Sequence, residues 1–299
     1  MPDPPARTDS LAVAAVAGSA ALFGLTGTIA ALGPDDLAPF VAGVWRSVIG
    51  GLCLIGLSAW RRMPITRYPL RNPWVIAGGL GVAMYQLAFF EAVDRTGVAL
   101  GTLVTIGAGP PFAGLLDWFA SGRRPSTPWF VGSTIAIGGV ALLSGRSSDA
   151  DATGIVFALV AASSFPFFGT ACQRLMRDRP FLPAMATVFG AGMVVLFPIA
   201  ALTARDVFTD GSAVATVAAL GIVTLTFAYV LWGVGLRTLS LSVVVTTTLV
   251  EPAVASTLAV VVLDEPATPA LAVGLALVAV GVLISSRPSR TAISREPLP

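Results

Sequence analysis

The chain has 299 residues, of which 55% are hydrophobic and only 11% are charged, and its formal net charge is +2. Soluble proteins contain about 25% charged residues, so this composition excludes a soluble globular domain and indicates that lipid surrounds much of the protein. A membrane-spanning helix needs about 20 apolar residues, so the chain accommodates about ten such helices. No room remains for a soluble catalytic or nucleic-acid-binding domain.

The apolar segments predict an all-α integral membrane protein. Residues 1–10 do not resemble a cleavable signal, and the apolar run after them is long enough to span the membrane. Gly, Pro and charged residues mark the breaks between segments. The expected helices cover residues 11–32, 38–60, 74–93, 98–120, 128–144, 153–173, 181–203, 213–235, 240–262 and 267–286.

The residue types narrow the chemistry further. The chain has no His, and all 18 of its basic residues are Arg, which removes the commonest general base and the commonest metal ligand. Cys53 and Cys172 both lie in apolar stretches, and two isolated cysteines do not form a zinc site. We therefore expect no metal, no cofactor, no nucleic-acid partner and no enzymatic activity.

The charged residues predict the orientation in the membrane. With the N-terminus in the cytoplasm, the outer loops hold only Arg95, Arg146 and Arg205, and Arg46 lies within a helix. The remaining arginines all fall on the inner side: Arg7, Arg61, Arg62, Arg67, Arg71, Arg123, Arg124, Arg174, Arg177, Arg179, Arg237, Arg287, Arg290 and Arg295. Inner loops of membrane proteins carry an excess of Arg and Lys, so the sequence predicts a multi-pass protein of the cytoplasmic membrane with both termini inside.

A motif occurs twice, at a distance of 141 residues. Pro111 corresponds to Pro252 and Thr105 to Thr246, and Pro125-x-Thr127-Pro128 corresponds to Pro266-x-Thr268-Pro269. Because the repeat unit contains five helices, an odd number, its second copy must enter the membrane in the opposite direction. Inverted repeats of this kind are typical of secondary transporters.

The repeat defines the expected organisation of the chain. A cytoplasmic tail, 1–10, precedes the first five-helix repeat, 11–144. An outer linker, 145–152, leads to the second repeat, 153–286, and a cytoplasmic tail, 287–299, ends the chain.

The sequence resembles the EamA-type branch of the drug/metabolite transporter superfamily over about residues 11–286. The resemblance rests on Leu249-Val250-Glu251-Pro252, Leu263-Asp264-Glu265-Pro266-Ala267-Thr268, the segment from Gly274 to Gly281, Val44-Trp45-Arg46 and Gly109-Pro110-Pro111. It implies ten helices, two repeats and a central substrate pathway. It does not imply a particular substrate, since members of the family move amino acids, metabolites and drugs.

Two charged residues stand near the centres of expected helices. A charged residue at a helix centre costs about 2.5–3.5 kcal/mol on insertion scales, so such groups face a cavity and have a use by default. Arg46, beside Trp45, either binds an anionic substrate group or is tied to backbone carbonyls or an acidic partner. Glu251 either carries a proton, or satisfies backbone groups, or pairs with Arg46.

Several uncharged residues complete the candidate site. Tyr85 and Gln86 either line the cavity or hold helices together, because a buried hydroxyl or amide needs a partner. Pro110, Pro111 and Pro252 are expected to break their helices.

These features favour a secondary transporter, with export as the expected direction, for a small metabolite, amino acid or drug-like compound. Proton coupling through Glu251 is one variant and facilitated diffusion is the other. A membrane-embedded lipid-modifying enzyme and a non-transporting scaffold are the alternatives. Membrane lipids and the small-molecule substrate are the expected partners, and a homodimer is left open.

Overall fold

The computed structural model describes residues 5–63, 71–122, 124–143, 151–177, 180–264 and 266–286, which contain helices and no strand. The first half comprises α1 (Pro5–Ala31), α2 (Pro39–Trp60), α3 (Pro73–Ser121) and α4 (Thr127–Leu143). The second half comprises α5 (Ala152–Met176), α6 (Phe181–Leu202), α7 (Ala204–Phe208), α8 (Gly211–Gly221), the π-helix η2 (Ile222–Phe227), α9 (Ala228–Leu236), α10 (Leu241–Thr247), α11 (Val250–Val262) and α12 (Pro269–Ser285).

The described part of the chain has seven helical segments that are long and apolar enough to cross a membrane. They are Ser10–Ala31, Pro39–Trp60, Pro73–Gly97, Ala152–Met176, Phe181–Leu202, Gly211–Leu236 and Leu241–Val262. Two shorter apolar helices, Thr127–Leu143 and Pro269–Ser285, accompany them. The prediction of an all-helical, multi-pass membrane protein is confirmed.

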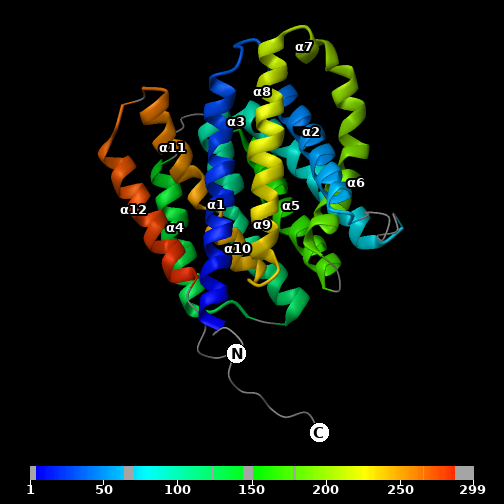
Figure 1. The fold of residues 1–299 in the computed structure, drawn as a ribbon. Helices are drawn as coiled ribbons and strands as arrows, with labels where there is room; N and C mark the ends of the chain where they lie inside the picture. Colours follow the sequence, from blue (N-terminus) through cyan, green and yellow to red (C-terminus); the bar gives the residue numbers. More distant parts are fainter. Residues whose placement is uncertain are drawn as a thin grey trace.

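The helices form one elongated bundle, in which α1 begins and α12 ends at the same end, the lower end in Figure 1. In the interior, α3 packs against α5 and α6, and α1 packs against α9 and α11. At one side, α4 pairs with α12, while α2 pairs with α6 at the other (Figure 1). This arrangement surrounds the ends of α10 and α11 with helices from both halves of the sequence.

Several helices begin at side chains that accept hydrogen bonds from free backbone N–H groups, as helix N-termini require. Asp151 accepts from Thr153 and Gly154, Asn72 accepts from Trp74, and Thr268 accepts from Leu271. Asp210 accepts from Ser212, and these hydrogen bonds lower the pKa of the Asp210 carboxyl. Capping residues in the sequence therefore mark where several of these helices begin.

Proline does not place the helix breaks where the sequence predicts them. Pro110 and Pro111 lie inside α3, which continues through both residues, so the break expected there is wrong. The non-helical residue in α3 is Gly97, whose φ of 77° and ψ of 160° join two helices across a sharp kink. A residue without Cβ adopts this conformation at little cost.

The break near Pro252 precedes the proline. Helix α10 ends at Thr247, and α11 begins at Val250. Between them, Leu249 donates its N–H to the carbonyl of Thr246, and Glu251 donates to that of Thr248. Pro252 has no N–H to extend the α-helical pattern backward, so the span Leu241–Val262 is a discontinuous helix.

The span Gly211–Leu236 contains a π-helical turn that the sequence does not predict. Its middle turn, η2, is a π-helix, which is wider than an α-turn. The Thr226 hydroxyl donates to the carbonyls of Gly221 and Gly50, so η2 is tied to α2 as well as to its own helix. Such turns occur frequently at functional sites.

Candidate functional site

A small cavity lies where both halves of the sequence meet. Its volume is about 20 Å³, and its lining residues are Tyr85, Thr105, Ile106, Gly109, Phe165, Val245, Thr248 and Glu251. A space of roughly 10–15 Å³ or more accommodates one water when polar partners are present. The structure therefore has room for about one water molecule between α3, α5 and the break that separates α10 from α11.

The polar groups of the cavity come from both sides of that break and from α3. Glu251 supplies a carboxyl group, Tyr85 a phenolic hydroxyl, and Thr105 and Thr248 two aliphatic hydroxyls. The Thr248 hydroxyl also donates to the carbonyl of Val245 at 2.7 Å, which satisfies part of the interrupted helix. Four oxygen-bearing side chains, one of them a carboxyl group, therefore border the cavity beside the apolar side chains of Ile106, Phe165 and Val245.

Phe165 of α5 lines the cavity, and an aromatic wall of Trp232, Tyr229 and Phe23 continues from it to α9 and α1. Sequence reasoning missed these residues. The ring of Tyr85 lies 5.7 Å from that of Phe165, which lies 5.6 Å from Trp232. Tyr229 follows, 5.8 Å from Trp232 and 5.0 Å from Phe23. The rings come from segments far apart in the chain, so no local sequence signal groups them.

Arg46 lies near the cavity but does not line it. Its Nη2 donates to the carbonyl of Thr224 in η2 at 3.2 Å, and its Nε has no hydrogen-bond partner among the described residues. The guanidinium group is within electrostatic range of Glu251 and Tyr85, yet the described ion pairs include none between Arg46 and Glu251. Arg46 is therefore tied to a backbone carbonyl, which is one of the alternatives that the sequence left open. Its Nε is without a partner among the described residues.

Trp45 and Gln86, the other two predicted substrate-binding candidates, do not line the cavity. The ring of Trp45 packs edge-on against Phe208 at 4.9 Å, in an apolar cluster that includes Val207. Gln86 accepts a hydrogen bond from Ser47 at 3.1 Å, so it joins α3 to α2. The structure thus brings Tyr85 and Glu251 together and places Trp45 and Gln86 in helix contacts.

A second charged cluster lies at the C-terminal end of the first part of α3, just before Gly97. Arg95 bonds to Glu91 at 2.6 Å and approaches Asp151 at 3.7 Å. All three side chains are partly exposed, which limits the strength of such pairs. Glu91 thus takes part in local charge pairing outside the cavity.

The fold and the cavity together define a multi-pass membrane protein with a polar site enclosed by its helices. The sequence pattern of the EamA-like transporter family matches residues 10–145 and, a second time, residues 152–287. The two matches cover nearly the whole chain, so the protein belongs to the EamA-like transporter family and carries two copies of its domain. It is a membrane transporter.

Two known proteins show how far the similarity extends. An uncharacterized transporter of Bacillus subtilis (strain 168), YwfM, is 32% identical over 274 residues, which are 91% of this chain and 92% of that protein. A protein of known crystal structure has the same fold, with a TM-score of 0.77 at 22% identity, over 92% of this chain and 96% of that one.

Proposed function

We propose that the protein is a secondary transporter that moves a small organic compound across the cytoplasmic membrane through the cavity at Glu251. The observation that carries this proposal is the composition of the cavity. Tyr85 and Thr105 come from the first family copy, and Phe165, Thr248 and Glu251 come from the second. Transporters with internal repeats bind their substrates and coupling ions at the interface between repeats, beside discontinuous helices.

The proposal includes ten spanning segments in two inverted repeats. Helices α4 and α12 have 17 residues each, which is the lower limit for a spanning helix. An even number of crossings is supported by the positions of the start of α1 and the end of α12, which lie at the same end (Figure 1). The second part of α3 and the span Leu241–Val262 also run in opposite directions. Asp117 contacts Ser242, whereas Thr105 and Glu251 meet at the cavity.

Reporter fusions test this topology. A reporter fused after Gly122 should be active only in the cytoplasm, and one inserted at Thr209 only on the outer side. The reason is that these positions follow an even and an odd number of proposed crossings, respectively. A fluorescent protein reports the cytoplasmic side, and alkaline phosphatase reports the outer side. The same side for both positions would contradict the inverted arrangement.

Flux in proteoliposomes tests the function. A cell-based screen of amino acids, metabolites and drug-like compounds, with and without the gene, supplies a labelled substrate. The purified protein should then exchange this substrate across the vesicle membrane in counterflow, while vesicles without protein should not. Export remains a prediction, which accumulation in inside-out membrane vesicles would bear out. No counterflow of any compound that the screen identifies would contradict the proposal.

Arg46 is proposed to receive an anionic group of the substrate, because its Nε lacks a partner and it lies beside the cavity. Arg46→Lys keeps the charge but loses the planar fork, so we expect about a tenfold increase in KM with a smaller change in maximal rate. Concentration-dependent counterflow measures both. An Arg46→Gln protein that is well folded and transports with the KM of the unmodified protein would show that the Thr224 contact is the whole role of Arg46.

A further inference from the structure

Polar side chains of α3 and α4 bond to helix α10, and one of α5 bonds to the turn before it. Helix α10 is the short first part of the span Leu241–Val262, and it follows α9 in the lower half of the molecule in Figure 1. Val245 and Thr248, at and just beyond its C-terminal end, line the cavity. A movement of α10 would therefore change the wall of the cavity.

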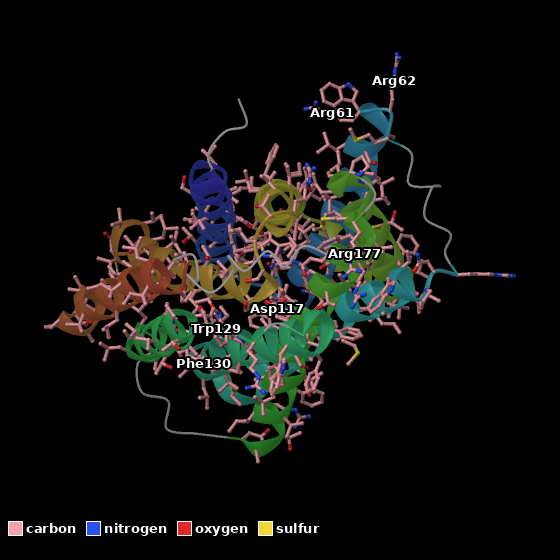
Figure 2. The ribbon with its side chains drawn as sticks, turned by 90° about the horizontal axis from the view of Figure 1, so that it is seen from below. Arg61, Arg62, Asp117, Trp129, Phe130 and Arg177 are labelled. Carbon is pink, nitrogen blue, oxygen red and sulfur yellow. The ribbon has the colours of Figure 1, made fainter. Side chains whose placement is uncertain are left out.

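The first contact is made by Asp117 of α3. Its Oδ2 accepts the backbone N–H of Ser242 at 2.6 Å, at the first turn of α10. A carboxylate at a helix N-terminus satisfies a free N–H and interacts favourably with the helix dipole. Figure 2 shows Asp117 near the centre of the molecule as seen from the lower end, where the last part of α3 meets α10. The contact joins the first family copy to the second.

The second contact is made by α4. The indole Nε1 of Trp129 donates to the Thr246 hydroxyl at 3.0 Å, and Ser133 shares a hydrogen bond with the same hydroxyl, also at 3.0 Å. All three residues are buried. This contact again joins the two family copies, two residues before the break at Thr248.

The third contact holds the turn that leads into α10. Gln173 of α5 donates its side-chain amide to the carbonyls of Leu236 and Leu239, at 3.3 Å each. The turn between α9 and α10 is therefore attached to α5, within the second family copy. The hydrogen bonds of Asp117, Trp129 and Ser133 reach α10 from the first copy, in which α1 also packs against α10.

The break beyond α10 provides a pivot. Thr248 still donates its N–H to Val244, four residues back, but Leu249 and Glu251 donate to carbonyls only three residues back, and Pro252 contributes no N–H. Element-terminal residues of this kind absorb the backbone rotations of a hinge. A rotation there would move α10 while α11, which packs on α1 and α12, stays in place.

We propose that α10 is the inner gate of the transporter, pivoting at Thr248 and Leu249, and that Asp117, Trp129 and Ser133 form the latch that holds it closed. This inference rests on the proposed function and topology. In the closed state the latch joins the two family copies below the cavity. Opening breaks the Asp117–Ser242 and Trp129–Thr246 hydrogen bonds and connects the cavity to the cytoplasm.

Thiol accessibility tests the gate without a substrate. In a Cys53→Ser, Cys172→Ala background, the single thiol of Thr248→Cys reports access to the cavity. A membrane-impermeant methanethiosulfonate is applied to inside-out vesicles and, separately, to right-side-out vesicles. Asp117→Ala should raise the rate of modification from the cytoplasmic side by roughly tenfold, because it removes a charge-assisted hydrogen bond of the closed state. Glu91→Ala, which removes a partly exposed carboxylate from the first part of α3, is the matched control and should not raise it.

A cross-link tests the same gate in the opposite direction. The Asp117→Cys, Ser242→Cys protein, oxidised to a disulfide, should lose counterflow and recover it after reduction. An unchanged modification rate in well-folded Asp117→Ala, or full counterflow in the cross-linked protein, would overturn the gate. Should Asp117→Ala misfold, Asp117→Asn and the cross-linked protein decide. Altered accessibility without flux of any compound would instead contradict the proposed function and leave the gate standing.

Discussion

Replacing Glu251 by Gln is expected to leave the protein folded and inserted but to remove the part of transport that a pH gradient drives. Glu251 is the carboxyl group that lines the cavity, and it lies next to the break in a spanning helix. A carboxyl group there can bind and release a proton as the cavity opens to alternate sides, and Gln has nearly the same volume but cannot. We expect at least a tenfold drop in pH-driven flux in proteoliposomes, with counterflow retained because it requires no net proton movement.

Glu91→Gln is the matched control for this experiment. Glu91 is also a carboxylate on a spanning segment, but it is partly exposed and paired with Arg95. Its replacement should leave pH-driven flux unchanged. If Glu251→Gln keeps its full pH-driven flux, Glu251 is a structural residue and facilitated diffusion becomes the better description. If Glu251→Gln fails to insert, a role in satisfying backbone groups gains support.

Replacing Gly281 by Leu is expected to cause the largest loss of stability among single substitutions in α12. Helices α4 and α12 approach at Gly132, Gly139, Gly274 and Gly281. A Cβ atom at Gly281 would meet the backbone of Gly132 and the backbone N of Ala136, and backbone atoms cannot rotate away. Overpacking costs about 1–3 kcal/mol where side chains can adjust, so we expect at least about 3 kcal/mol here.

A control for the Gly281 substitution exists in the same pair of helices, α4 and α12. Gly138 of α4 is exposed, and a Cβ added there meets no atom within 4 Å. Gly138→Leu should therefore be neutral or slightly stabilising, since Leu favours a helix over Gly. Thermal unfolding of the purified proteins in detergent compares the two variants. Equal melting temperatures would contradict a close approach of α4 and α12.

The sequence predicts the helix boundaries well where breakers and charges are local. The expected segments 38–60 and 181–203 correspond to Pro39–Trp60 and Phe181–Leu202. In both, Pro stands at or near the beginning of the helix. Arg61 and Arg62 follow directly after Trp60 and end the apolar stretch. Hydropathy and turn residues act on neighbouring residues, so they can be read from a linear sequence.

The site is predicted only in part, because its assembly depends on helix packing. Glu251 and Tyr85 are recognisable as polar residues within apolar segments, and they do meet at the cavity. Phe165 and Tyr229 resemble ordinary core aromatics in the sequence, although they form the wall beside it. Trp45 is the opposite case. It is a candidate in the sequence because it stands beside Arg46, but in the structure its ring packs against Phe208.

The π-helix η2 has a consequence for comparing relatives of this protein. An α-helix turns by about 100° per residue, so one residue added to or removed from a turn rotates everything beyond it by that angle. The wide turn at Ile222–Phe227 is a place where one residue can be lost by returning to an ordinary turn. Such a deletion would turn Tyr229 and Trp232 away from the aromatic wall unless the preceding helix, Gly211–Gly221, rotated instead. Alignments should therefore allow a gap within residues 222–227, and relatives with that gap should differ in which face of the span meets Arg46.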